Sequence, residues 1–159
     1  MILPHLKKWS RRLSSGREEG DVISAAGSRD PDIYIVNEFG YKRLFINPVI
    51  FGFYKHLGGF EKVKRVSPEA RDSFPISSIF RNCEDDDPRI YALEVSGEDS
   101  GVLHWIDMTS EKVTEEDPNF FKKTFCINRN EFNWYTNGGK VFGFEYDTLE
   151  LVSEYKARP

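Results

Sequence analysis

The chain has 159 residues, of which 39% are hydrophobic and 30% are charged, and its formal net charge is −4. This length suits one domain, or two small domains that share a core. Aromatic residues make up 14% of the chain, which together with the low net charge excludes an intrinsically disordered protein. No apolar stretch approaches the roughly 18 residues that a membrane span needs, so we expect no transmembrane segment.

Residues 1–20 form a basic N-terminal extension. Five Lys and Arg residues outnumber two Glu there, so this segment carries +3 and the remaining chain carries −7. Apolar residues recur at spacings of three and four, which predicts a short amphipathic helix. A helix of this kind can bind an anionic membrane surface or an acidic partner, here through Lys7, Lys8, Arg11 and Arg12. The alternative is a frayed extension that packs one or two apolar side chains on the domain.

Residues 21–82 form the first of two predicted repeat units. Two β-rich runs, at 33–36 and 41–46, flank the Gly-bearing turn at 37–40, which predicts a β-hairpin. Asn47 suits a helix N-cap and Pro48 suits the first helical position, so a short helix is expected next. A short strand within 60–66 and a helical turn that begins at Ser67 complete this unit.

Residues 83–159 form the second predicted unit, with a hairpin made of "RIYALEV" and "VLHWIDM". The pattern "INPVIFGFY" of residues 46–54 recurs as "INRNEFNWY" in residues 127–135, where Asn128 is the N-cap. The hairpins start 57 residues apart and the two patterns lie 81 apart, which predicts an insertion at about 109–124. The expected fold class is α+β: two diverged β-hairpin-plus-helix units sharing one core, with a mainly antiparallel sheet and short helices.

Chemistry-bearing residues are sparse in this sequence. Cys83 and Cys126 permit one disulfide in an oxidising compartment, whereas two buried thiols are the alternative in a reducing one. The three histidines show no spacing typical of a metal site or an activated nucleophile, so we expect no metal, no cofactor and no catalytic residue. The acidic run at 84–87 favours solvated charge over a calcium site. The acidic body argues against nucleic-acid binding, which needs clustered cations.

Two strand segments combine aromatic and basic residues, as recognition surfaces do. Aromatic rings stack on sugars, and neighbouring cations hold anionic groups. The candidate ligand-binding residues are Tyr41, Lys42, Arg43, His104 and Trp105. The alternative is that Tyr41 and Trp105 belong to the core, that His104 is a partly buried strand residue, and that Lys42 and Arg43 are merely solvated.

The order of motifs along each unit adds a family resemblance. The first unit contains, in order, Ile33-Tyr34, Gly40, Lys42-Arg43, Asn47, Phe53-Tyr54, the strand 63–66 and the turn 67–69. This order resembles a hairpin-plus-helix repeat of exported cell-surface or wall-associated proteins from uncultivated, small-genome bacteria of candidate phyla. The second unit matches from Ile90-Tyr91 to Trp134-Tyr135 but lacks the Lys-Arg pair.

The resemblance implies a non-catalytic module at an extracellular or cell-surface location, with a protein or a cell-envelope polymer as its partner. No signal peptide is visible, so a cytoplasmic location is the alternative. The leading hypothesis is a non-enzymatic cell-surface structural or binding module with a glycan or protein ligand. The second hypothesis is an intracellular adaptor that docks through its basic amphipathic N-terminus. The third is a hydrolase that uses the acidic loops and His104, and it has the weakest pattern of residues.

Overall fold

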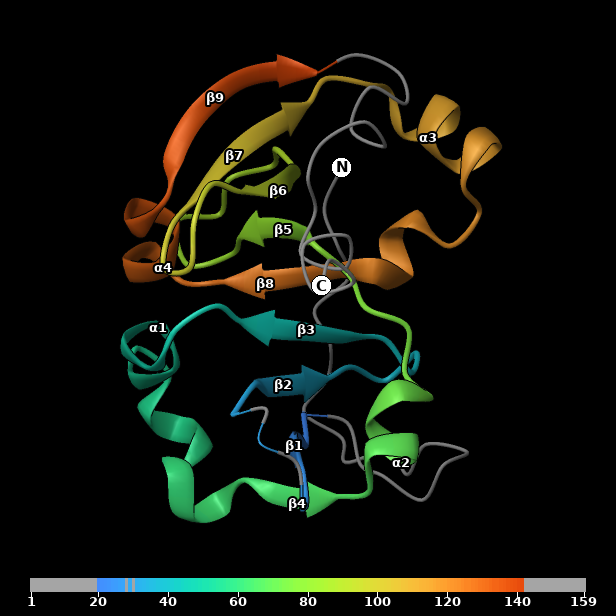
Figure 1. Ribbon diagram of the computed structural model, residues 1–159. Helices are drawn as coiled ribbons and strands as arrows, with labels where there is room; N and C mark the ends of the chain where they lie inside the picture. The colour runs from blue at the N-terminus through green and yellow to red at the C-terminus, as the bar shows by residue number, and fades with distance from the viewer. Residues whose placement is uncertain (1–19, 28, 30, 142–159) are drawn as a thin grey trace. The chain divides into compact units, whose positions relative to one another are not determined.

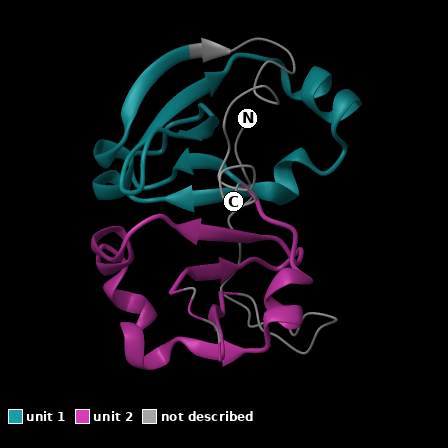
Figure 2. Cartoon of the chain, viewed as in Figure 1, with its two compact units in different colours: residues 1–4, 78–159 teal, residues 5–77 magenta. Residues whose placement is uncertain are grey.

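The computed structural model describes residues 20–27, 29 and 31–141, and the predicted N-terminal helix with Lys7, Lys8, Arg11 and Arg12 lies outside them. The fold is α+β, with two sheets of mainly antiparallel strands and few short helices (Figure 1). The chain divides between Ser77 and Ser78 into two compact units. The first unit along the chain is magenta in Figure 2, where the key calls it unit 2, and the second is teal, where the key calls it unit 1. None of the helices in this described part is long and apolar enough to cross a bilayer.

The first unit, residues 20–77, contains a four-stranded sheet in the order β3-β2-β1-β4. Its strands are β1 (Val22–Ala25), β2 (Ile33–Val36), β3 (Lys42–Phe45) and β4 (Lys64–Val66). Strands β1, β2 and β3 pair antiparallel, and β4 pairs parallel with β1. The chain passes from β3 to β4 through α1 (Pro48–Gly52), η1 (Lys55–Leu57) and η2 (Phe60–Lys62), and α2 (Pro68–Asp72) follows β4.

The second unit, residues 78–141, contains a five-stranded sheet in the order β8-β5-β6-β7-β9. Its strands are β5 (Ile79–Asn82), β6 (Tyr91–Val95), β7 (Gly101–Ile106), β8 (Thr124–Ile127) and β9 (Thr136–Val141). Strands β5, β6 and β7 pair antiparallel, while β8 pairs parallel with β5 and β9 parallel with β7. The helices are α3 (Ser110–Glu116), η3 (Phe120–Lys123) and α4 (Arg129–Trp134).

The two sheets repeat one strand register. In the first unit, Ile23 lies opposite both Tyr34 and Lys64, and Tyr34 lies opposite Leu44. In the second unit, the same row consists of Phe80, Tyr91, Phe125 and Trp105. The residue numbers of equivalent positions therefore differ by 57 in the first two strands of each unit (80 − 23) and by 61 in the next two strands (125 − 64). The four extra residues lie in the β6–β7 hairpin, which is longer than the β2–β3 hairpin.

This correspondence continues beyond the four shared strands. The backbone N–H of Ala26 donates to Val66 O, as that of Cys83 donates to Ile127 O. Ser67 caps α2, and Asn128, 61 residues later, caps α4 in the same way. Even the isolated parallel bridge between Lys42 and Ile76 has a counterpart, which is the pairing of Leu103 with Asn137 in β7 and β9.

The structure confirms the two hairpins and the helix N-caps at Asn47, Ser67 and Asn128. The predicted equivalence of residues 46–54 and 127–135 is wrong, because α1 follows the third strand of its unit and α4 follows the fourth. The predicted insertion at 109–124 is also wrong: Leu44 to Lys64 and Trp105 to Phe125 both span 20 residues. The unit boundary, predicted between residues 82 and 83, falls before β5, which pairs with β6 and β8.

Candidate functional site

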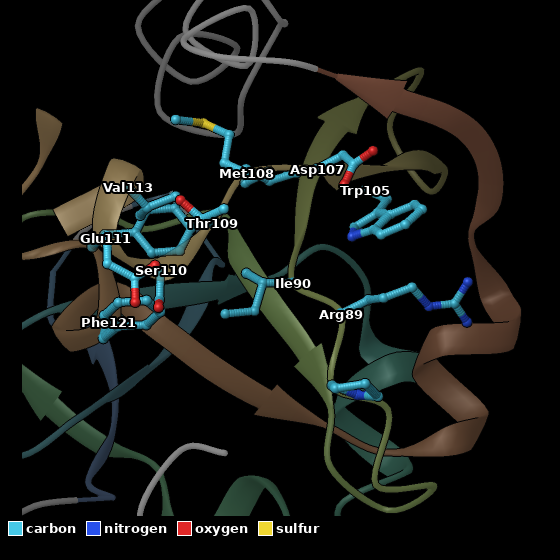
Figure 3. A pocket seen from close by; sticks show the side chains of 13 residues that line it. Arg89, Ile90, Trp105, Asp107, Met108, Thr109, Ser110, Glu111, Val113 and Phe121 are labelled. Carbon is cyan, nitrogen blue, oxygen red and sulfur yellow. The ribbon is translucent and has the colours of Figure 1, made fainter. Parts of the chain in front are cut away.

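A cavity of about 410 Å³ opens in the second unit, between the start of β6, the end of β7, α3 and η3. Its volume lies in the range of small-molecule sites. In Figure 3, the lining residue Ile90 lies between Trp105 and Arg89 on one side and Val113, Thr109 and Phe121 on the other. The cavity thus lies between the hairpin and the helical connector that links β7 to β8.

The inner wall of the cavity is apolar. Ile90, Ile106, Val113 and Phe120 are buried and belong to one core cluster, against which Met108 and Phe121 pack. The Phe120 and Phe121 rings meet edge to face, with centroids 5.2 Å apart. The rim is polar, and its side chains are Arg89, Asp107, Thr109, Ser110 and Glu111. A ligand with an apolar body and polar substituents would match both surfaces.

Local sequence chemistry places α3 beside the cavity. The Thr109 side chain accepts a hydrogen bond from the Lys112 N–H at 3.2 Å and so caps the helix. Lys112 pairs with Glu116 one turn later, at 3.1 Å, on the exposed side of the helix. Val113 is the buried residue of α3 and contributes to the apolar wall. The cap and the single apolar position therefore set which face of α3 borders the cavity.

A hydrogen-bonded cluster at the start of β6 positions Arg89 at the rim. Asp87 accepts from the Arg89 Nε and backbone N–H at 3.0 Å each, and from the Tyr91 hydroxyl at 3.0 Å. Burial acts to raise the pKa of Asp87, but the hydrogen bonds from Arg89 and Tyr91 outweigh it and lower the pKa overall. Burial and the bond to Asp87 raise the pKa of Tyr91 to about 12.

Trp105 forms an aromatic wall beside this cluster. It lies opposite Tyr91 in the β6–β7 ladder, and the Arg89 guanidinium carbon lies 5.8 Å from the centroid of each ring. The Arg89 side chain remains 48% exposed. A guanidinium held between two aromatic rings and a carboxylate is fixed in orientation while part of its surface stays open to a ligand.

The corresponding place in the first unit is filled by side chains. Phe45, at the end of β3, is buried, and its ring centroid lies 5.2 Å from that of Phe51 and 5.6 Å from that of Tyr54. The Arg43 guanidinium carbon lies 4.0 Å from the same Phe45 ring. One copy of the repeated fold therefore packs this region with aromatic rings, while the other copy has a cavity there.

The basic pair predicted to bind a ligand is internal in the structure. Arg43 is 2% exposed, and Lys42 is 6% exposed. The Lys42 Nζ donates to the Arg71 carbonyl at 2.6 Å and lies 4.9 Å from the centroid of the Tyr34 ring. Burial lowers the pKa of Lys42, against the opposing effect of Asp72. The two side chains are thus buried among residues of the first unit.

The remaining predicted residues are distributed over both units. Tyr41 is half-buried in the first unit, where its N–H donates to Asn37 Oδ1 at 3.0 Å. The His104 Nε2 lies 3.4 Å from Glu94 Oε1, and Gly138 of β9 packs directly against the imidazole ring. Among the five candidates, Trp105 is the one that lines the cavity.

The acidic run at 84–87 is engaged by cations. Arg81 pairs with Asp86 at 2.8 Å, and the Arg129 Nε donates to Asp85 Oδ1 at 2.7 Å. The hydrogen bond from Arg129 is the main reason why the pKa of Asp85 is lowered. Within the part of the chain that the structure describes, no group of three His, Cys, Asp or Glu residues is arranged to hold a metal ion.

Cys83 and Cys126 are joined by a disulfide across β5 and β8. Cys83 follows β5 directly, and Cys126 lies opposite Arg81 in the parallel ladder. Cys126 is exposed, which leaves one end of the bond open to solvent. The equivalent positions in the first unit are Ala26 and Arg65, so the bond belongs to the copy that has the cavity.

Sequence reasoning missed most of the cavity residues. Arg89 reads as one more charge in an acidic loop, and Ile90 reads as an ordinary strand residue. The segment predicted as an insertion, at about 109–124, supplies about half of the lining residues. Arg89 and Tyr91 alternate at the start of a hairpin whose second strand carries Trp105. This pattern is the sequence signal for an aromatic-cation cluster.

Comparisons of this chain with protein-family models, with curated proteins and with solved structures gave no match.

Proposed function

We propose that the protein is a non-enzymatic binding module of an extracellular or cell-surface compartment, and that a glycan or protein group binds in the cavity beside α3. The observation that carries this proposal is the combination of an apolar wall with a fixed Arg89–Trp105 pair at a polar rim. Carbohydrate groups and peptide side chains present the matching chemistry, because both join apolar faces to hydrogen-bonding groups.

Two ionisable groups next to Arg89, Asp87 and Tyr91, are poorly suited to acid–base catalysis. A general acid or base works best when its pKa lies near the operating pH. The pKa of Asp87 is lowered and that of Tyr91 is raised to about 12, so both move away from neutrality. His104, the residue of the hydrolase hypothesis, contacts Glu94 and Gly138 and does not line the cavity.

The disulfide supports the compartment assigned in this proposal. Disulfides persist in oxidising environments and are rare in reducing ones. The Cys83–Cys126 bond is therefore expected in a protein that works outside the cytoplasm. The exposure of Cys126 strengthens this point, because an accessible bond meets the thiols of a reducing compartment directly.

Two tryptophans of the second unit provide a matched test. An immobilised panel of cell-envelope oligosaccharides and peptides is incubated with the wild type, Trp105→Ala and Trp134→Ala. Trp134 is partly exposed and donates to the Asp99 carbonyl at 2.8 Å, away from the cavity lining. We expect Trp105→Ala to weaken binding of any positive compound at least about tenfold, and Trp134→Ala to change it less than about twofold.

The bound compounds are also examined by mass spectrometry after prolonged incubation. Recovery of intact compound supports a binding module. Turnover of many molecules per protein would contradict the non-enzymatic assignment. Binding that is equally sensitive to both substitutions, or to neither, would contradict the assignment of the cavity.

A further inference from the structure

The segment from η1 to β4, residues 55–65, follows α1 in the first unit (Figure 1). Its cations are exposed. We call this segment the basic connector. Its cations are Lys55, Lys62, Lys64 and Arg65, all exposed, and Glu61 is the one carboxylate within it. The formal charge of the segment is thus +3 with His56 neutral, in a chain whose net charge is −4.

Most of the ion pairs among the described residues involve cations outside the basic connector. Arg81, Arg89, Lys112, Lys123 and Arg129 each lie within about 3 Å of a carboxylate. In the connector, Lys64 pairs with Asp21 at 2.7 Å. Among the described residues, Lys55, Lys62 and Arg65 show no such pair. Three positive charges therefore remain available to an external anion.

An exposed aromatic ring lies within the same segment. Phe60 is 60% exposed, and its ring centroid lies 5.0 Å from that of the buried Phe51, which holds it against the unit. The Lys62 stem packs over Gly58, since a Cβ there would lie 2.5 Å from Lys62 Cγ. Gly58 has a φ of 88°, so the turn that brings these side chains together requires glycine.

The second unit shows that the fold does not require this basic character. By the shared register, Lys64 and Arg65 of β4 correspond to Phe125 and Cys126 of β8. Both strands lie at the edge of their sheets and pair parallel with the first strand of the unit. The same structural positions thus hold a buried ring and a disulfide in one copy, and exposed cations in the other.

We propose that the basic connector binds an acidic polysaccharide, with carboxylate groups at Lys55, Lys62 and Arg65 and a sugar face on Phe60. Exposed aromatic rings stack on sugar faces, and cations hold the acidic groups of the chain. A strand added at β4 fits less well, because edge lysines oppose pairing with another strand. This site lies on the first unit and is independent of the cavity proposed above.

Immobilised polygalacturonate, a polymer of sugar carboxylates, is the probe. Lys55→Gln/Lys62→Gln/Arg65→Gln is compared with Lys112→Gln/Lys122→Gln/Arg129→Gln, which removes three positive charges from the second unit. We expect the first variant to bind at least about tenfold more weakly and the control to stay within about twofold. Raising the salt from about 50 to about 300 mM should weaken binding of the wild type.

Phe60→Ala separates a polysaccharide from other polyanions. It should weaken binding to polygalacturonate but leave binding to inorganic polyphosphate unchanged. The proposal is overturned if the wild type does not bind polygalacturonate, or if the two triple variants lose affinity equally, since net charge alone would then explain it. It is also overturned if polyphosphate or RNA binds more tightly than polygalacturonate, because the connector would then be a phosphate site.

Discussion

Loss of the Cys83–Cys126 disulfide should destabilise the second unit strongly. The bond joins residues 43 positions apart, and so closes a loop that includes the acidic run, the β6–β7 hairpin, α3, η3 and the start of β8. Restricting a loop of this length in the unfolded chain corresponds to about 4 kcal/mol at 25 °C. Such a value is a large part of the ~5–15 kcal/mol by which domains are usually stable.

Urea unfolding of the wild type and of Cys83→Ala/Cys126→Ala measures this effect. Two of the three tryptophans, Trp105 and Trp134, lie in the second unit, so their fluorescence follows it once Trp9 is replaced by Phe. With a slope of about 1–1.5 kcal/mol per molar urea, the midpoint should fall by roughly 2–4 M.

The double variant is also the control for the reductant. Reduction should lower the midpoint of the wild type to that of the variant, and should leave the variant unchanged. Equal midpoints for the oxidised wild type and the double variant would refute the reasoning, because the bond would then contribute nothing to the stability of the folded unit.

Three further predictions concern packing and pH. Phe51→Ala should lower the free energy of unfolding by about 3–5 kcal/mol, because Phe51 is 3% exposed. Phe132→Ala should lower it less, because that ring is only partly buried. Equal urea midpoints for the two variants would contradict this prediction. Gly138→Ala should destabilise by about 1–3 kcal/mol, since the added methyl meets Val102 and His104, while Gly52→Ala, in open space, should not. Folding raises the pKa of Tyr91 to about 12, whereas the unfolded chain releases this proton at about pH 10, so the free energy of unfolding should fall between these pH values. Tyr91→Phe should remove this part of the fall. The same dependence of stability on pH in the wild type and the variant would contradict the raised pKa of Tyr91.

Local signals in the sequence were sufficient for the hairpins and the helix starts. Each hairpin is a pair of β-branched and aromatic runs around a turn, and both are formed as predicted. Asn47, Ser67 and Asn128 each accept the N–H three residues later, as their position before a helix predicts. These features depend on neighbours in the chain, so a single sequence can indicate them.

The alignment of the two repeats could not be read in the same way. A capping Asn followed by aromatic residues marks the start of a short helix wherever it occurs, and it does not identify which helix of a unit is meant. Strands β1 and β5 occupy equivalent positions in the two units and would fix their alignment. Each has only four residues, however, and neither alternates between buried and exposed side chains. Their separation of 57 residues equals that of the hairpins, and this equality is the sequence signal that indicates the correct alignment.

The burial of Lys42 and Arg43 depends on contacts distant in sequence. A Lys-Arg pair in a strand predicts an exposed face, since these residues are almost never fully buried without partners. The partners here are the Tyr34, Phe45 and Tyr54 rings and the Arg71 carbonyl. The cavity has the same origin, because its walls come from three separate segments of the second unit.

The most direct test of the binding site is methyl NMR of the wild type titrated with a compound that the oligosaccharide and peptide panel has identified. The account predicts shifts concentrated at Ile90, Ile106 and Val113, which line the cavity, with little change at Ile50 in the filled region of the first unit. Shifts centred on Ile50, or spread evenly over both units, would contradict the assignment of the cavity as the ligand site.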